Sequence, residues 1–385
     1  MFDNFKSKIL FWRDRRTLGV LSQLLILLIV VAIFLFLGNN LVNNLQQKNI
    51  GFSFGFLNNA ATFDIGDKVI DFGRGDSYLK AILVGLLNSF RVMVLGIILA
   101  TLLGVAVGIG KLADNWLVRQ IATVYVDILR NTPLLLQLFF WYSAVFLNLP
   151  KIENPLTLLK SVYLTNRGVY IPSPAGTVST WLAWGFIVGS TVLMAIIWNK
   201  RIQTREWGFT ARRQKILLVT MAIAIIFAFV WGLNWQQPQL DAEANTIVGG
   251  LHLLPELASL LIGLSVYTGA YIAEIVRAGI ESVDKGQWEA ARALGLKSSP
   301  IMQSIVFPQA LRVIIPPLTN EYLNLAKNSS LALAVGYNDL YSIANTISNN
   351  TGRSLEILLI VIAIYLAINL IISSFSNWYN ARIQF

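Results

Sequence analysis

Long apolar runs alternate along this 385-residue chain with shorter polar segments rich in Asn, Gly, Pro and basic residues. A run of about 20 apolar residues is long enough to cross the hydrocarbon core of a bilayer as a helix. The runs predict about eight spans, near 18–40, 82–110, 119–148, 181–199, 216–234, 256–276, 303–326 and 355–377. The pattern therefore predicts an all-α, polytopic membrane protein.

The first apolar run follows a basic segment, as it does in a secretory signal sequence. The run is longer than a typical signal-sequence core, and an Asn- and Gln-rich stretch follows it where a small-residue cleavage site would stand. We therefore expect a retained span. The outer segments 41–80 and 149–180 are expected to be surface loops or short interfacial pieces.

Basic residues are concentrated in alternate connecting segments. Lys and Arg cluster in the N-terminal segment and in the loops after the second, fourth and sixth predicted spans, whereas 235–255 contains neither. Short cytoplasmic loops carry such an excess of positive charge. Both termini are therefore predicted to lie in the cytoplasm, with 287–296 on the same side.

Composition narrows the function classes. The chain is 55% hydrophobic and 13% charged, and its net charge of +10 is explained by cytoplasmic loops rather than by nucleic-acid binding. It has no cysteine and one histidine, His252, and neither G-x-S-x-G nor H-E-x-x-H occurs. The segment 104–112 lacks the phosphate-loop spacing. We expect no catalytic residues and no metal site.

The segment 287–296, QWEAARALGL, is a short polar helix between two predicted spans. Glu289 and Arg292 are spaced to pair, and Gly295 is placed to end the helix in the left-handed conformation. The helix has a small apolar side: Trp288, Ala290 and Leu294. On composition alone, it is either an amphipathic connector on the membrane surface or a segment that docks into a partner.

Four separated motifs resemble one family. The segment 289–331, which begins EAARALGLKSSP and continues through FPQALR, resembles the EAA loop of permease subunits of ATP-binding-cassette (ABC) importers. The segments LLNSFRVMVLGIILATLLGVAVGIGKL (86–112), YVDILRNTPLLLQLFFWY (125–142) and YTGAYIAEIVRAGIESVDKGQWEAARALG (267–295) resemble the polar amino-acid, histidine/glutamine-type branch. The resemblance covers about 80–148 and 256–380.

The resemblance implies a type I importer permease core whose 287–300 helix couples to a separate ATPase. It implies coupling roles within an EAA loop at about 281–308 for Trp288, Glu289, Ala290, Ala291, Arg292, Gly295 and Pro308. It implies no cofactor on this chain, because ATP and Mg belong to the partner ATPase. The implied partners are an ATPase dimer, a second homologous permease (a heterodimer or a homodimer) and a periplasmic amino-acid-binding protein.

Ionisable and polar residues inside the core spans are candidates for a translocation path, because such groups are too costly to face lipid. Asp127 and Arg130 are spaced to pair, and Pro316-Pro317 is expected to interrupt the seventh span beside a polar stripe. The candidates are Glu274, Tyr271, Asn320, Asn324, Arg130, Asn88, Ser89 and Arg91. For each of them, packing between helices is an equally good interpretation.

The chain departs from the minimal five-span branch in two places. It adds an N-terminal span and loop at 1–80, and an insertion at 149–255 with two further spans, around core parts at 81–148 and 256–385. With these additions, the chain resembles the larger permeases of general L-amino-acid importers, which lie in the bacterial inner membrane. The basic loop 198–215 suggests contact with anionic lipid or a role in setting the orientation of the chain.

Three functions are open to a chain with this pattern. The first is the permease subunit of an ATP-driven importer of polar amino acids. The second is an ion-coupled secondary transporter that acts alone and leaves the 287–300 helix without a role. The third is a membrane-embedded enzyme, for which the sequence offers no catalytic constellation. The sequence leaves open which amino acids are moved.

Overall fold

The computed structural model describes the chain except for residues 1–14, 48–50, 159–160, 205–208, 242–244 and 384–385. It divides into two compact units, Met1–Asn59 and Ala60–Phe385. The first contains helix α2 (Arg15–Gln47) and the 3₁₀ turn η1 (Gly55–Asn58). The apolar side chains of α2 are exposed nearly throughout, as expected for a helix surrounded by lipid or by a partner.

Six helices in the described residues are long and apolar enough to cross a membrane. They occupy Leu18–Asn40, Tyr78–Lys111, Val178–Ile197, Pro255–Glu281, Ser298–Val335 and Ser354–Trp378. Shorter apolar helices, Leu134–Asn148 and Ile216–Gly232, stand where the third and fifth spans are predicted. The places of the predicted spans therefore agree with apolar helices, while six rather than eight meet the length criterion.

The third predicted span is broken. Helix α4 (Trp116–Arg130) ends before Pro133, and α5 (Leu134–Phe139) continues into a π-helical turn η2 (Phe140–Val145) and η3 (Phe146–Asn148). Pro133 lacks an N–H and disfavours a helical residue before it. The buried Gln137 amide donates to the carbonyls of Leu129 (2.9 Å) and Thr132 (3.0 Å), which satisfies groups freed at the break.

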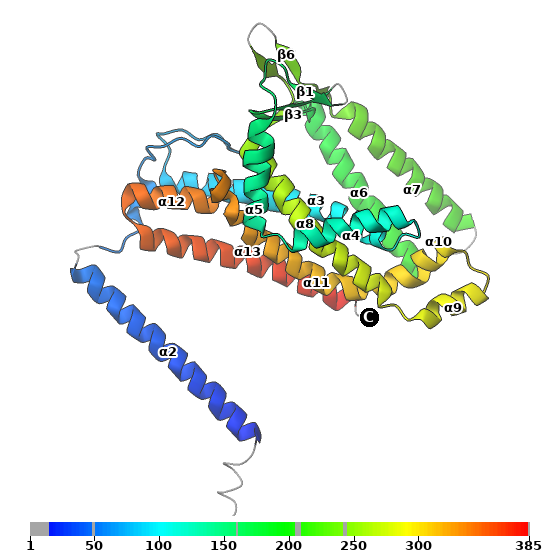
Figure 1. Ribbon diagram of the computed structural model, residues 1–385, viewed down its shortest axis with the longest axis horizontal. Helices are drawn as coiled ribbons and strands as arrows, with labels where there is room; N and C mark the ends of the chain where they lie inside the picture. Colours follow the sequence, from blue (N-terminus) through cyan, green and yellow to red (C-terminus); the bar gives the residue numbers. More distant parts are fainter. Residues whose placement is uncertain (1–14, 48–50, 159–160, 205–208, 242–244, 384–385) are drawn as a thin grey trace, which may run out of the picture. The chain divides into compact units, whose positions relative to one another are not determined.

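Helices α3 (Tyr78–Lys111) and α8 (Pro255–Glu281) form the centre of the second unit (Figure 1). Their backbones approach closely because glycine faces the contact. A Cβ added at Gly104 would lie 2.6 Å from the Ile272 side chain, and one at Gly108 would lie 2.7 Å from the Ala273 carbonyl oxygen. Small residues allow membrane helices to pack at such short range.

Two apolar clusters lie along this pair of helices. One contains Ile272, Val276 and Ile280 of α8 with Ala291 and residues of 301–325, and the other contains Leu257, Leu260 and Leu264 with Val92, Leu138 and Tyr337. Both helix ends are therefore fixed by side-chain packing. The 27 residues of α8 span about 40 Å, so its two ends lie on opposite sides of the apolar layer.

The insertion contains helices and a small sheet. Helices α6 (Val178–Thr204) and α7 (Phe209–Phe227) pack on each other and lead into η4 (Ala228–Gly232). A four-stranded antiparallel sheet has the order β1-β2-β3-β8, with β1 Leu156–Leu158, β2 Val162–Thr165, β3 Gly168–Ile171 and β8 Leu251–Leu253. Two further pairs join β4 (Ser173–Pro174) to β5 (Trp235–Gln236) and β6 (Gln239–Asp241) to β7 (Thr246–Val248).

The expectation that 149–180 would be only loops or interfacial pieces is therefore wrong. Its strands are two to four residues long, too short to show an alternating pattern. One of them pairs with β8, about 80 residues later in the chain, and a pairing so distant has no local sequence signal. The sheet lies at the N-terminal end of α8, which we call the sheet end (Figure 1).

The C-terminal part follows the other end of α8. Helix α9 (Lys285–Ala293) leads through α10 (Ser298–Ile301) and the π-helical turn η5 (Met302–Val306) into α11 (Phe307–Asn328). The chain then forms η6 (Ser329–Val335), α12 (Leu340–Thr351) and α13 (Ser354–Ile383). Helix α11 continues through Pro316 and Pro317, so the predicted interruption there is wrong. The irregular turn lies earlier, at η5, directly before Pro308 at the start of α11.

Candidate functional site

Helix α9 is short and closed at both ends by local hydrogen bonds. The Asp284 side chain accepts from the Gly286 N–H at 2.6 Å, which caps the first turn. At the other end, the Leu296 N–H donates to Ala291 O and the Gly295 N–H donates to Arg292 O, with Gly295 at φ +74°. This is a Schellman ending, so Gly295 terminates the helix as its sequence predicts.

One side of α9 packs against the rest of the chain. Ala291 is buried and Trp288 is half-buried, and both belong to the apolar cluster that also contains Met302 and Ile305 of the turn η5. Ala290 and Leu294 were expected to share this apolar side with Trp288, but they face away from it. The inward face uses the 288/291 spacing, because the contacts come from η5 rather than from the membrane surface.

The other side of α9 is uncovered. Glu289, Ala290 and Arg292 are exposed, and Leu294 is 80% exposed at the end of the helix. Glu289 and Arg292 form no ion pair with each other among the ion pairs of the described residues, so the predicted pairing is not made. The side of α9 that faces away from η5 thus presents an exposed leucine together with two exposed charged side chains.

A polar cavity of about 310 Å³ lies halfway along α8, and we call it the mid-helix pocket. It is lined by Tyr267, Thr268, Tyr271, Glu321, Asn324, Lys327 and Asn328. The Tyr267 hydroxyl donates to the Tyr271 hydroxyl at 3.2 Å, and the Arg130 guanidinium lies over the Tyr271 ring, 5.1 Å from its centre. Three predicted path residues, Tyr271, Asn324 and Arg130, are therefore brought together at or beside one cavity.

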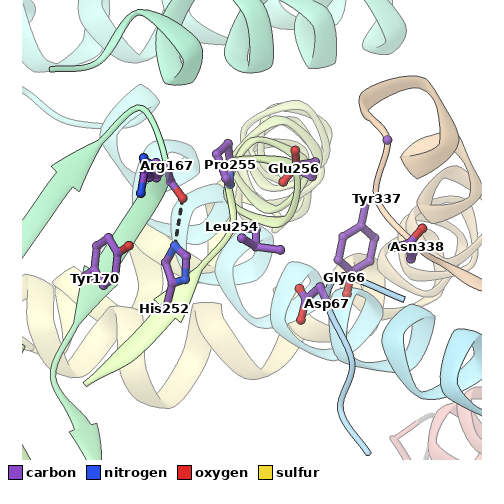
Figure 2. Close-up of a pocket in the computed structure, with 11 residues that line it drawn as sticks. Gly66, Asp67, Arg167, Tyr170, His252, Leu254, Pro255, Glu256, Tyr337 and Asn338 are labelled. Atoms are coloured by element: carbon purple, nitrogen blue, oxygen red, sulfur yellow. Dashed lines mark hydrogen bonds between the residues drawn. The ribbon is translucent and has the colours of Figure 1, made fainter. Parts of the chain in front are cut away.

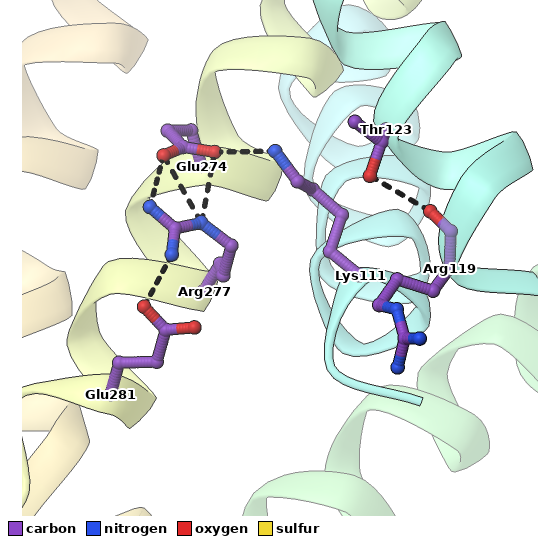
Figure 3. A network of polar contacts seen from close by, with 6 residues as sticks. All are labelled: Lys111, Arg119, Thr123, Glu274, Arg277 and Glu281. Carbon is purple, nitrogen blue, oxygen red and sulfur yellow. Dashed lines mark hydrogen bonds and ion pairs between the residues drawn. The ribbon is translucent and has the colours of Figure 1, made fainter. Parts of the chain in front are cut away.

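Glu274 lies one turn beyond this pocket, and its carboxylate forms ion pairs with two basic side chains. Its carboxylate accepts from Lys111 Nζ at 2.8 Å and from Arg277, and Arg277 also pairs with Glu281 (Figure 3). Lys111 is the last residue of α3. In this structure Glu274 ties α3 to α8, and it does not line the mid-helix pocket.

Asn88, Ser89 and Arg91 lie near the sheet end and are used in packing. The buried Asn88 amide donates to the carbonyls of Asp67 (2.7 Å) and Asn338 (2.8 Å). The Ser89 hydroxyl accepts from the Leu340 N–H at 2.9 Å, and Arg91 pairs with Asp67 and with the Tyr337 hydroxyl. These three residues join α3 to the segments 60–77 and 336–340.

The remaining predictions fare differently. Asn320 is exposed and does not line the mid-helix pocket, and no Asp127–Arg130 ion pair occurs in the described residues, because Arg130 is turned toward Tyr271. Thr268 was missed. Its position between Tyr267 and Tyr271 on α8 is the signal that would have suggested it.

The comparisons with known proteins define the class. Residues 214–385 match the family described as "Binding-protein-dependent transport system inner membrane component". Similar relatives are YhdX of Escherichia coli (strain K12), whose name describes an amino-acid ABC transporter permease protein, and the general L-amino acid transport system permease protein AapQ of Rhizobium johnstonii. The identities are 43% over 378 residues (94% of this chain, 93% of YhdX) and 40% over 373 residues (96% and 93% of AapQ).

A solved structure described as an amino acid ABC transporter with histidines matches 79% of this chain and 95% of its own, with 21% identity and a TM-score of 0.49. The relatives decide the family. This chain belongs to the permeases of amino-acid ABC transporters, within the inner-membrane components of binding-protein-dependent transport systems. It is a multi-pass inner-membrane protein.

Proposed function

We propose that this chain conducts polar amino acids, delivered by a periplasmic binding protein, through the membrane, and that ATP hydrolysis in a separate ATPase subunit drives this step through α9. The uncovered face of α9 carries the proposal. A short helix with an 80%-exposed leucine, fixed to the spans on its opposite side, is suited to dock in a cleft of a partner.

The connection from α9 to the spans supports the coupling role. Trp288 and Ala291 pack on η5, and η5 runs directly into α11, which supplies one wall of the mid-helix pocket. A displacement of α9 by the ATPase would therefore act on α11 without passing through a flexible linker. Pro308 stands in the first turn of α11, directly after η5.

The mid-helix pocket is the proposed passage for the substrate. Its wall carries one carboxylate and one ammonium, Glu321 and Lys327, and neither forms an ion pair in the described residues. A zwitterionic amino acid needs an anion near its ammonium and a donor near its carboxylate. The Tyr267–Tyr271 pair adds hydroxyl groups that accept or donate hydrogen bonds.

The basic connecting loops and the family support the remaining parts of the proposal. We propose that both termini lie in the cytoplasm, that a second homologous permease (a heterodimer in preference to a homodimer) completes the passage, and that this chain hydrolyses no ATP and binds no cofactor. The core would comprise 81–148 and 256–385, with 1–80 and 149–255 as additions. ATP and Mg would be held by the ATPase dimer.

The test is uptake of labelled amino acids into proteoliposomes that contain the permeases and the ATPase, with and without ATP and the binding protein. We expect uptake only with both. Leu294→Asp should abolish ATP-driven uptake and the stimulation of ATP hydrolysis by the binding protein. Asp114→Asn, an exposed change in the loop after α3, is the control and should leave both intact. Uptake by the permeases alone would favour an ion-coupled secondary transporter.

Because the chain contains no cysteine, a Leu294→Cys variant has one reactive thiol. In the assembled complex it should cross-link to the ATPase subunit. Cross-linking to lipid probes alone would contradict the coupling role of α9. Glu321→Gln and Lys327→Met should lower uptake but leave the Leu294→Cys cross-link unchanged, since they alter the passage and not the docking helix.

A further inference from the structure

A second cavity, of about 540 Å³, lies at the sheet end of α8 (Figure 2). Four separate segments build it: the loop at Gly66-Asp67, the segment 167–170 that enters β3, the segment 252–256 that runs from β8 into α8, and the loop 336–338. The strands belong to the insertion 149–255 and contribute Tyr170 and His252, and Arg167 stands in the turn before β3. We call it the sheet-end pocket.

The walls of this pocket are held in place by polar contacts. The rings of Tyr170 and His252 stack with centres 4.2 Å apart and planes at 4°, and His252 Nε2 lies 2.9 Å from the Arg167 carbonyl oxygen (Figure 2). On the opposite side, Arg91 holds both the Asp67 carboxylate and the Tyr337 hydroxyl. The pocket is therefore built before any ligand arrives.

Two charges on the wall remain without an ion-pair partner. The Asp67 carboxylate is neutralised by Arg91. Glu256, in the first turn of α8, accepts a hydrogen bond from the Tyr142 hydroxyl at 3.2 Å, and neither Glu256 nor Arg167 enters an ion pair in the described residues. Glu256 and Arg167 thus line the same cavity without an ion pair between them.

This charge set selects one class of small ligand. A free amino acid carries one ammonium and one carboxylate, and a purely anionic or purely cationic ligand would leave Glu256 or Arg167 facing a like charge. Charge-assisted hydrogen bonds to both groups are stronger than neutral ones. The volume lies within the range of small-molecule sites, about 300–1,000 Å³.

We propose that the sheet-end pocket is an entry site for free zwitterionic amino acids, with the ligand carboxylate at Arg167 and its ammonium at Glu256. The inference rests on the proposed function and adds to it a binding site that precedes the mid-helix pocket. Tyr267 follows Glu256 by 11 residues of α8, so the mid-helix pocket lies roughly 17 Å further along the helix. The ligand would be held at the sheet end before it reaches Tyr267 and Tyr271.

The cysteine-free sequence provides the test. In the complete transporter in membrane vesicles, an Asn338→Cys variant is labelled with a membrane-impermeant thiol reagent. Asn338 lines the pocket and accepts from the Asn88 amide through its backbone carbonyl, so the substitution keeps that contact and leaves Arg167 and Glu256 in place. An Arg74→Cys variant, exposed and absent from the pocket wall, is the matched control.

The probe is an equimolar mixture of polar L-amino acids, and the comparison is a mixture of their methyl esters, which lack the carboxylate. At ligand concentrations about ten times the dissociation constant, the free amino acids should slow labelling of Asn338→Cys about tenfold. The esters should not slow it, and Arg74→Cys should be labelled at one rate throughout. Adding either Arg167→Met or Glu256→Gln to Asn338→Cys should remove the protection, which a merely structural role of these two side chains would not predict.

Two results would overturn the inference. One is unprotected labelling by the amino acids while the same complex without cysteine substitutions imports them. The other is protection by the ligand-free binding protein together with none by amino acids, which would make the pocket a docking contact. Failure of the proposed function is separately visible, because the unmodified complex would then show no ATP-dependent uptake.

Discussion

Lys111 Nζ at the end of α3 lies 2.8 Å from Glu274 Oε2 in α8, and this ion pair joins two helices that pack along much of their length. Glu274 also binds Arg277 of its own helix, so one carboxylate serves two cations (Figure 3). The side chains are 12% and 25% exposed, which limits screening by solvent. This ion pair therefore holds α3 against α8 near the end of α8 that leads to α9.

The Lys111–Glu274 ion pair predicts which substitutions lower the stability of the protein most. Lys111→Met leaves Glu274 with Arg277, whereas Glu274→Gln leaves Lys111 and Arg277 without their shared carboxylate. We expect a loss of about 1–2 kcal/mol for the first and more for the second, because unpaired buried charges are costly. Apparent melting temperatures of the purified complex measure this order. Lys80→Met is the control, since the Lys80–Asp76 pair has the same 2.8 Å distance but is local and more exposed. Equal losses of stability in all three variants would contradict the claim that this ion pair holds α3 against α8.

The close approach of α3 to α8 predicts a difference between two glycines of α3. Gly104→Ala would place a methyl 2.6 Å from Ile272, while the nearest atom to a methyl at Gly110 would be 3.5 Å away. Overpacking of this kind costs about 1–3 kcal/mol, whereas Gly110→Ala should be neutral or slightly stabilising in a helix. Yield and melting temperature of the two variants check the prediction. If Gly104→Ala folded and melted like the native chain, the close packing of α3 on α8 would be disproved.

Local rules predicted the α-helical elements and Gly295 well. Apolar runs locate the helices because the bilayer requires a fixed length, and the sequence QWEAARALGL specifies both α9 and its left-handed ending. The break at Pro133 was missed, since Gln137 and the carbonyls that it satisfies are recognisable as partners only once the turn is formed.

Tertiary choices among polar residues were beyond the sequence. The spacing of Glu274 and Tyr271 places both on one face of α8. In the structure, however, Glu274 pairs with Lys111, 163 residues away in sequence, whereas Tyr271 lines the mid-helix pocket. The sheet-end pocket needs four segments that are distant in sequence, so neither His252 nor Arg167 carried a signal in isolation. Helix α12 (Leu340–Thr351) was also missed, because it is too short and polar to be predicted as a span.

Gly295 predicts that backbone conformation, rather than crowding, limits substitution at the end of α9. Its φ is +74°, and a Cβ there would meet nothing within 4 Å. Gly295→Asn should be tolerated because Asn adopts the left-handed conformation readily, whereas Gly295→Val should cost about 1–2 kcal/mol and loosen the Schellman ending. We expect Val to uncouple uptake from ATP hydrolysis while the protein remains inserted. Measuring both rates in proteoliposomes checks this, and normal coupling in the Val variant would contradict it.

Asp339 predicts a pH dependence of stability. It lies in the turn before α12, outside the spanning helices, and is fully buried; its Oδ1 accepts from the Ser342 N–H at 2.8 Å, and the Tyr365 hydroxyl lies 3.4 Å from Oδ2. Burial raises the pKa of Asp339 from 3.8 to about 7, although these hydrogen bonds oppose the shift.

The sign follows from proton binding. Between pH 3.8 and about 7 the folded chain holds a proton on Asp339 that the unfolded chain has lost, so the stability contributed by this group is full below that range and declines as the pH rises through it. The slope is at most about 1.4 kcal/mol per pH unit, and it vanishes above pH 7.

Asp339→Asn keeps an acceptor for Ser342 and cannot ionise. Its melting temperature should match that of the native chain near pH 4 and exceed it near pH 8. Asp71→Asn, at a fully exposed carboxylate, is the control and should show no such divergence. Parallel melting curves for Asp339→Asn and the native chain across this range would show that Asp339 is ionised in the folded protein.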